Sequence, residues 1–297
     1  MKRGLFVLAL GACVPALGST DAVVSRPRIL AVRADPAEAK PGARVTLTAL
    51  VASPRGMVTA PAIAWTFCTA PKPLTEDNVV SSACLDGSSS IPAGDGAAIT
   101  AATPADACSL FGPIAPPGGG RPRDPDVTGG YYQPLRADLA GSDATFALLR
   151  IICDLANAPA ASAAAFAAAY RPNQNPKLLP VVATVDGAGV ALSSIPAGAR
   201  VKLTASWPAA SVETYAHYDA ASDTVTSKRE SMSLSWYATA GMLDTEATGR
   251  AEDDPATLSN NTWTAAPTAG TAFLWIVLRD SRGGVDYASY ELTVVGR

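Results

Sequence analysis

The feature that most constrains the fold of this 297-residue sequence is an internal repeat. Residues 40–49 read KPGARVTLTA, and residues 195–205 read IPAGARVKLTA. In both copies a Pro/Gly turn precedes a run of alternating apolar and polar residues, the pattern of a half-buried β-strand. Apolar runs at 29–32 and 178–182 precede the two copies, and stretches containing Trp65 and Trp236 come after them. The same order of elements, found twice, predicts two β units that each have a separate apolar interior.

The second copy continues with an apolar run at 271–279, a turn at 280–284 and an alternating run at 285–295, which together predict a closing hairpin. Each copy has the same order of elements: a strand, a turn, an alternating strand and a strand with a tryptophan. This order resembles the opening of an immunoglobulin-like sandwich, in which the tryptophan fills the space between the sheets. Residues 274–284, LWIVLRDSRGG, resemble the last hairpin of bacterial Ig-like and PKD-like repeats in cell-surface proteins. The resemblance covers most of the second unit and the opening of the first, and it implies a fold rather than an activity.

The sequence therefore predicts a mostly β protein with two Ig-like β-sandwich domains in tandem, at 26–156 and 177–297. Between them, at 157–176, we expect a helical linker, because residues 159–170 are rich in alanine and place Phe166 and Tyr170 on one helix face. This short junction helix would end before Pro172, and a flexible Ala/Pro linker is the alternative. Trp207, Trp236 and Trp275 occupy strand positions that predict core residues, whereas Trp263 is less certain.

The first unit departs from the pattern between Cys84 and Asp143. This stretch is rich in Gly, Pro, Ser and Ala, which predicts a long irregular insertion. Because binding residues are often on loops held by a rigid scaffold, we expect the insertion to be the binding surface.

Residues 1–18 have the pattern of a signal peptide. Lys2 and Arg3 precede an apolar stretch at 5–12, which is too short for the roughly 20 residues that a membrane-spanning helix needs. The sequence LGAC at 10–13 resembles a bacterial lipobox and predicts cleavage before Cys13, with subsequent lipidation of that cysteine. Cleavage after Gly18 by ordinary signal peptidase is the alternative. The lipobox is favoured because the apolar stretch stops at Cys13 and Pro15 interrupts the residues beyond it.

The remaining four cysteines are an even number in an exported chain, which predicts two disulfides: Cys68, Cys84, Cys108 and Cys153. Three pairings are possible. Ile63, Trp65 and Phe67 alternate as one buried face, so Cys68 falls on the opposite, outer face. An outward cysteine reaches a nearby loop more easily than it crosses the core, and this favours Cys68–Cys84 and Cys108–Cys153.

Charge and residue usage exclude several classes of function. The 23 basic and 26 acidic side chains give a net charge of −3, which does not fit a basic nucleic-acid binder. The only histidine is His217, and it has no nucleophile motif beside it. Disulfides would consume the thiolates that a cysteine nucleophile needs. We therefore expect no enzyme activity and no cofactor, with calcium as the one possible exception.

Two hypotheses for ligand binding come from the insertion. Asp124, Asp126 and Thr128 match the opening of a calcium-binding loop, in which alternate side chains direct oxygens at the ion. The pattern fails at its twelfth position, Leu135, and a turn in which aspartate caps its own backbone is the alternative. Tyr131 and Tyr132 could form a stacking platform for a glycan.

These features together predict a non-catalytic cell-envelope lipoprotein that acts as a structural or adhesive interaction module. It would be anchored to the outer membrane of a bacterium, or be periplasmic or secreted. Its lipid would bind the membrane, and its other partners would be envelope proteins or glycans. The alternative is a ligand-binding module, for calcium or a glycan, that uses the insertion of the first domain.

Overall fold

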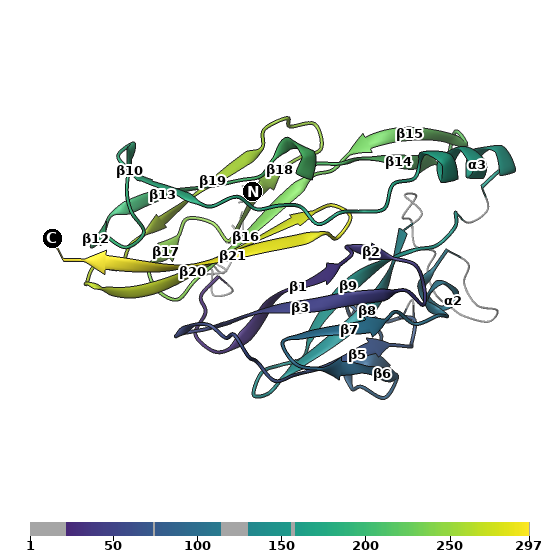
Figure 1. The fold of residues 1–297 in the computed structure, drawn as a ribbon, viewed down its shortest axis with the longest axis horizontal. Coiled ribbons are helices and arrows are strands. Elements are labelled where there is room, and N and C mark those ends of the chain that lie inside the picture. The colour runs from purple at the N-terminus through teal and green to yellow at the C-terminus, as the bar shows by residue number, and fades with distance from the viewer. Residues whose placement is uncertain (1–21, 74, 114–129, 156–157, 297) are drawn as a thin grey trace, which may run out of the picture.

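In a computed structural model of the chain, residues 22–73, 75–113, 130–155 and 158–296 are described, and they form two β-sandwiches that lie side by side (Figure 1). The prediction of a mostly β fold with two sandwiches is confirmed. None of the described helices is long and apolar enough to cross a membrane.

The first sandwich consists of two sheets that enclose one apolar core. One sheet contains β1 (Arg28–Asp35), β3 (Arg44–Ser53), β4 (Gly56–Met57) and β7 (Ala98–Ala102). The other has the order β2 (Glu38–Ala39), β9 (Thr145–Ile152), β8 (Gly130–Leu139), β5 (Ile63–Cys68) and β6 (Ser90–Asp95). β2 pairs in parallel with β9, whereas all other adjacent strands of this sheet pair antiparallel. Trp65 and Phe67 fill the space between the sheets, as the resemblance implied.

The second sandwich also consists of two sheets, and one of them repeats the strand order of the five-stranded sheet in the first sandwich. One sheet has the order β11 (Ala188–Gly189), β10 (Val182–Val185), β13 (Arg200–Ser206), β19 (Leu258–Thr264) and β17 (Met242–Leu243). The other has the order β12 (Ile195–Pro196), β21 (Val285–Val295), β20 (Gly270–Asp280), β16 (Met232–Ala238) and β18 (Ala247–Arg250). Again the short first strand of the sheet, β12, pairs in parallel with the last strand of the chain, β21.

The sequence repeat corresponds to β3 and β13, the strands that carry the two cores. Val45 and Leu47 pack in the first core, and Val201 and Leu203 pack in the second. The turns that precede these strands need a left-handed residue, which Gly42 and Gly198 supply with φ angles of 78° and 71°. The two cores share no residue, which agrees with the prediction of separate interiors.

The prediction that residues 84–143 form an irregular insertion is wrong for the described part of this stretch, and residues 114–129 lie outside the described residues. This stretch contains β6, β7 and β8, which complete the first sandwich, together with helices α1 (Ser82–Leu85) and α2 (Ala107–Phe111). The strand signal is weak because β7 reads AITAA and contributes only Ile99 and Ala101 to the core. Such short strands with few β-branched or aromatic residues resemble loops in sequence, and only pairing with β3 and β5 makes them strands.

The predicted junction helix is present as α3 (Ala160–Ala169). Its buried Phe166 packs on Ala216 and Tyr218 of a hairpin that was not predicted from the sequence, formed by β14 (Thr214–Asp219) and β15 (Thr224–Arg229). A short 3₁₀ turn, η1 (Ala209–Ser211), leads into this hairpin. A ten-residue helix is marginal in isolation, so the hairpin surface is what stabilises it.

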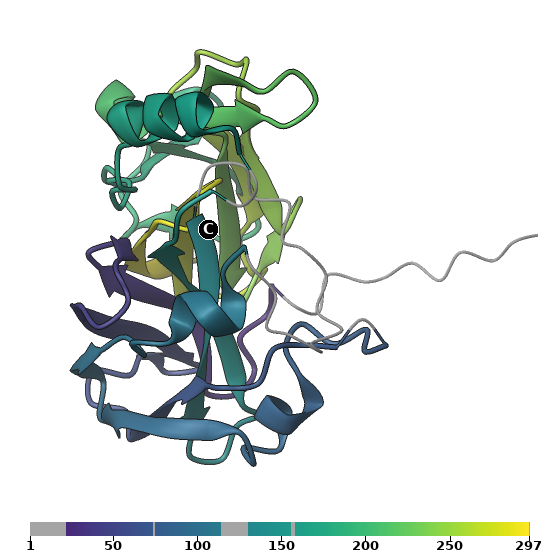
Figure 2. The same cartoon turned by 90° about the vertical axis from the view of Figure 1, so that its right-hand side faces the viewer.

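The outer faces of two sheets pack against each other and join the sandwiches. Leu30 of β1 and Leu50 of β3 belong to one buried cluster with Trp275 and Val277 of β20. Figure 2 shows the resulting stack from one end, with α3 and its hairpin at the top. Trp275 is therefore buried between the sandwiches rather than inside one of them, which corrects the expected core position. Trp263, in contrast, lies in the second core.

The first described residues attach to the second sandwich before the chain enters the first. Ala22 is buried in the second core, and its carbonyl accepts a hydrogen bond of 2.9 Å from the backbone N–H of Ala238 at the end of β16. The N–H of Val24 returns a 2.9 Å bond to the carbonyl of Ala238, and its side chain enters the cluster between the sandwiches.

We expect the substitution Trp275→Ala to lower the free energy of unfolding by about 3–5 kcal/mol, because it removes the largest buried side chain of the interface and leaves a cavity. The measurement is urea denaturation of both proteins. Val182→Ala is the control, since Val182 is 57% exposed and its truncation should change stability by less than about 0.5 kcal/mol. Equal stability of the Trp275→Ala variant and the control would show that the interface contributes nothing.

Candidate functional site

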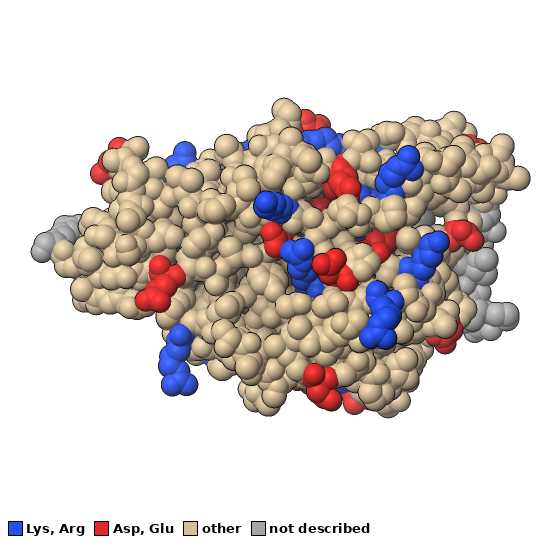
Figure 3. Space-filling model, in the orientation of Figure 1, with Lys and Arg blue, Asp and Glu red and all other residues tan. Residues whose placement is uncertain are grey.

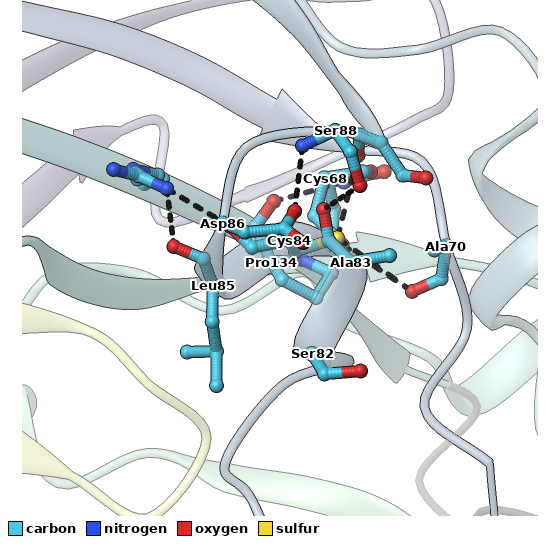
Figure 4. Close-up of a disulfide and its surroundings, with 12 residues drawn as sticks. Cys68, Ala70, Ser82, Ala83, Cys84, Leu85, Asp86, Ser88 and Pro134 are labelled. Atoms are coloured by element: carbon cyan, nitrogen blue, oxygen red, sulfur yellow. Dashed lines mark hydrogen bonds between the residues drawn. A yellow bond between two sulfur atoms is a disulfide. The ribbon is translucent and has the colours of Figure 1, made fainter.

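Two disulfides attach short helices to the first sandwich. Cys68, at the end of β5, is bonded to Cys84 in α1 (Figure 4), and Cys108 in α2 is bonded to Cys153, just after β9. This is the pairing that strand parity favoured. The bonds connect residues 16 and 45 positions apart, so each restricts the unfolded chain over a loop of substantial length.

The two helices cover the outer face of the sheet that contains β5, β8 and β9. The side chains buried beneath them form one cluster: Cys68, Val80, Cys84, Ala107, Phe111, Tyr131, Ile151 and Cys153. The Arg136 guanidinium of β8 fixes the end of α1 by donating hydrogen bonds to the carbonyls of Cys84 and Leu85. Cys68 thus points outward, as parity indicates, but into this covered layer and not into solvent.

The structure places the two candidate tyrosines differently. Tyr131 is 3% exposed and lies in the cluster under the helices, so its ring offers no face to a glycan. Tyr132 is half-buried, and the Arg150 guanidinium lies 5.7 Å from its ring centroid and donates to its hydroxyl at 3.2 Å. Tyr132 therefore contacts a cation of the chain itself.

The other predicted site residues lie outside the described residues: Cys13, Asp124, Asp126 and Thr128. Within the described ranges, no three or more His, Cys, Asp or Glu side chains are grouped so that they could hold a metal ion. His217 lies on β14 opposite Thr226 and is half-buried.

Charged and polar side chains, most of them buried, gather where the linker at 170–178 passes between the sandwiches. We call this cluster the joint, and it comprises Glu38, Arg150, Tyr170, Asn173, Glu213, Glu230, Asp280 and Arg282. It begins at Glu38 on β2, whose side chain faces away from the first core because its neighbour Ala39 faces inward. Arg150 Nε lies 3.3 Å from Glu38 Oε1. The Tyr170 hydroxyl donates to the same oxygen, and the Asn173 backbone N–H donates to Oε2 at 2.7 Å.

Asn173 connects this first half of the joint to the second sandwich. Its side-chain amide lies 3.2 Å from Oδ1 of Asp280, at the end of β20. The same carboxylate oxygen accepts hydrogen bonds from the backbone N–H groups of Arg282 and Gly284, at 2.9 and 2.8 Å. A Cβ atom on Gly284 would lie 2.0 Å from Asp280 Oδ2 and 2.8 Å from the carbonyl oxygen of Gln174. Only glycine fits this close approach of turn and linker.

Arg282 is 2% exposed although it belongs to a turn. Its Nε donates to Glu230 at 2.8 Å, one terminal nitrogen donates to Glu213 at 2.8 Å, and the other donates to the Arg171 carbonyl at 3.0 Å. The guanidinium also lies 4.9 Å from the Tyr215 ring centroid. One side chain thus joins the β20–β21 turn, the linker and the open end of the β14–β15 hairpin.

Burial changes the proton affinity of the joint. It raises the pKa of Glu230 to about 7, helped by the negative charge of Asp280 and opposed by Arg282. Burial also raises the pKa of Asp280, while the hydrogen bonds from Gly284 and Asn173 act in the opposite direction.

The joint was not predicted from the sequence. Residues 280–284 predict only a turn, and residues 171–175, RPNQN, predict only the end of a helix. Glu213 and Glu230 are far in sequence from both of these segments, 171–175 and 280–284. The one available signal is the density of amide side chains, Asn173, Gln174 and Asn175, in a segment that has few other features.

A cleft of about 640 Å³ lies between α3 and the end of β9. Its apolar lining includes Phe166 of α3 and Leu155, and Tyr170 connects it to the joint. The exposed side chains of Lys40 and Asp154 provide its charged groups. On the face shown in Figure 3, most charged side chains gather along the line where the sandwiches meet and toward the α3 end.

Comparison with known proteins yields only distant likenesses. No protein-family model matches the sequence, and no curated protein matches it. Solved structures that are similar include the adhesin InvE of Yersinia pseudotuberculosis, with 14% identity over 93% of this chain and 61% of that one, at a TM-score of 0.24. Invasin, described as a bacterial integrin-binding protein, has 11% identity over 91% and 39%, at a TM-score of 0.22.

A glycosyl hydrolase family 2 member from Bacteroides cellulosilyticus has 8% identity over 86% of this chain and 23% of that one, at a TM-score of 0.23. The chain thus spans less than two thirds of the length of each of these proteins. At such identities and TM-scores the likenesses carry no information about function. The Ig-like assignment rests on the strand order of the two sandwiches.

We expect Gly284→Ala to destabilise the protein by about 2 kcal/mol or more, because the added methyl group would overlap Asp280 and force the turn away from the linker. Gly189→Ala is the matched control, since no atom lies within 4 Å of a Cβ at that position. Urea denaturation gives both values. Tolerance of alanine at both positions would contradict the close packing of turn and linker.

Proposed function

We propose that this chain is a non-catalytic lipoprotein of the bacterial cell envelope that acts as a structural or adhesive interaction module. The observation that carries the proposal is the joint between the sandwiches. Domains of one chain usually move relative to each other unless their interface is large and apolar. Here the cluster around Trp275 and the buried contacts of Asp280 and Arg282 oppose such motion, which suits a protein that holds a surface at a fixed place.

The course of β16 supports an outward direction for the elaborated end of the protein. Ala238, at one end of β16, contacts the first described residues, and Met232, at the other end, pairs with Asp280 of the joint. Eight residues lie between Cys13 and Ala22, and the nine Cα–Cα steps span at most about 30 Å. A lipid on Cys13 would therefore hold the Ala238 end near the membrane, while α2, α3 and the β14–β15 hairpin lie toward the opposite end (Figure 1).

The charged side chains of the joint support a role without catalysis. Arg282 and its carboxylate partners bond to each other and to backbone groups of the linker. Asp280 accepts bonds from Gly284 and Asn173 in the same way. These groups are therefore engaged in holding the fold.

A ligand-binding module is the second candidate, and the cleft beside α3 favours it. Its volume is in the range of small-molecule sites, and its apolar lining carries a few charged groups, Lys40 and Asp154. Calcium bound by Asp124, Asp126 and Thr128, or a glycan stacked on Tyr132, would be the other forms of this alternative.

The lipoprotein part of the proposal predicts that wild-type protein, expressed with its leader in a bacterial host, partitions with membranes and incorporates labelled palmitate. The Cys13→Ser variant should lose both properties, because the serine hydroxyl does not replace the thiol that the lipid requires. Fractionation and mass spectrometry measure this. Soluble wild-type protein that begins at Ser19 would contradict the proposal.

Melting experiments separate the two candidates. A structural module should have the same melting temperature with calcium, with a chelator and with a panel of glycans, because only a ligand that binds the native state raises the melting temperature. A reproducible rise with any of these ligands would favour the binding module instead.

A further inference from the structure

We propose that the outer edge of β15 is a self-association surface, at which two copies of this chain pair their β15 strands antiparallel about a twofold axis through Thr226. The two β14–β15 hairpins would then join into one continuous sheet, with the two β15 strands at its centre. The inference rests on the interaction role proposed above, for which it names a surface and a partner.

The β14–β15 hairpin forms a small sheet of its own. The two strands pair only with each other, so the hairpin is a two-stranded sheet apart from the sheets of both sandwiches. One face of it lies on α3, where Val225 packs with Phe166 and Tyr218. The opposite face carries the exposed side chains of Thr224 and Thr226. Two-stranded sheets are marginally stable, and additional strands stabilise them.

The hydrogen-bond pattern shows which backbone groups of β15 are open. The Glu230 N–H donates to the Glu213 carbonyl at 2.9 Å, so these two residues form a hydrogen-bonded pair. Bonded and non-bonded pairs alternate along an antiparallel ladder. The backbone of Thr226 therefore bonds to β14, whereas the N–H and C=O groups of Val225 and Ser227 point away from it. Among the described residues none bonds to these outward groups, so this edge can accept another strand.

Several other edge strands of the chain are protected against such pairing. Asn175 and Arg279 donate hydrogen bonds to carbonyls of β1. β6 contains Pro92 and a register shift in its pairing with β5. β11 and β17 are only two residues long. These features usually prevent edge-to-edge association. β15, in contrast, is six residues long and contains neither proline nor glycine.

The charges of the hairpin favour a second copy as the partner. With the axis at Thr226, Lys228 of one copy lies opposite Thr224 of the other, and Asp219 is the cross-strand neighbour of Thr224. Each lysine thus approaches an aspartate of the other copy. Lys228 takes part in no ion pair with a described residue. A hydrogen bond from the Ala221 N–H lowers the pKa of Asp219, which keeps this carboxylate anionic.

The same charges select the register. The axis at Thr226 pairs Val225 of each copy with Ser227 of the other, and each such pair exchanges two backbone hydrogen bonds. An axis at Ser227 would instead place Lys228 opposite Thr226. The lysines of the two copies would then be diagonal neighbours on one face, where like charges repel.

The Thr226→Cys variant tests the pairing in the full-length chain. The Cα atoms of a non-bonded antiparallel pair are about 4.5 Å apart, within the range of about 4.4–6.8 Å that a disulfide spans. The variant, expressed with its leader in a bacterial host and treated with a mild oxidant, should therefore give a disulfide-linked dimer on a non-reducing gel.

Thr224→Cys is the matched control. Thr224 is exposed on the same face, but its two copies would be offset by about 14 Å along the strands, so this variant should remain monomeric. Equal amounts of dimer from the two variants, or no dimer from Thr226→Cys, would overturn the proposal.

The Ser227→Pro substitution tests the backbone bonds. It removes an N–H that is not used within the hairpin and that the pairing needs, and edge strands tolerate proline at such positions. Combined with Thr226→Cys, it should abolish the dimer, whereas Ser227→Ala should retain it. A dimer that persists with Ser227→Pro would contradict the pairing. Should Ser227→Pro fail to fold, Lys228→Glu decides: loss of most of the dimer supports the pairing, and an unchanged yield refutes it.

The lipid anchor has a separate readout. A missing dimer in protein that partitions with membranes and incorporates palmitate overturns the pairing and leaves the anchor intact. A dimer formed by soluble, unlabelled protein supports the pairing and contradicts only the anchor.

Discussion

The packing of two sheet faces that would normally be solvated is the constraint on which the rest of the structure depends. In an antiparallel sandwich one face of each sheet is ordinarily polar. Here β20 is apolar on both faces, so Leu274 and Ile276 enter the second core while Trp275 and Val277 need a different cover. β3 supplies it with Leu50 and Ala52. Since neither surface is satisfied alone, the two sandwiches pack side by side.

This packing explains why the polar side chain of Asn173, in the middle of the linker, is buried. Once the sandwiches are in contact, the chain between α3 and β10 must cross their boundary, and each buried backbone group needs a partner. The backbone N–H groups of Asn173 and Gln174 donate to the carboxylates of Glu38 and Glu213. The side-chain oxygen of Asn175 in turn accepts from the backbone N–H of Val285. Buried ion pairs often contribute little net stability, because desolvation offsets their attraction. Their effect here is geometric: Arg282 can satisfy Glu230, Glu213 and Arg171 only when linker, hairpin and turn are all in place.

The sequence contains much of the fold and little of the joint. Local patterns are sufficient for the repeated strands β3 and β13, for the closing hairpin of β20 and β21, for α3 and for the pairing of Cys68 with Cys84. They are insufficient for β6 and β7, whose small residues form strands only because their neighbours pair with them. The apolar residues between Leu274 and Leu278 indicate a strand without showing which face meets which core, so the place of Trp275 depends on the other sandwich. The joint unites Glu38, Asn173 and Asp280, which are more than 100 positions apart in the chain, and no local pattern predicts that contact.

The central claim is that interface and joint hold the two sandwiches as one rigid unit. Residual dipolar couplings of backbone amides, measured in weakly aligned protein at pH 6, test this most directly, because they report the orientation of each sandwich independently. One alignment tensor, with the same magnitude and axes, should fit the amides of β1 to β9 and those of β10 to β21. Two tensors of different magnitude would mean that the sandwiches move independently, and the claim of a rigid unit would then be wrong.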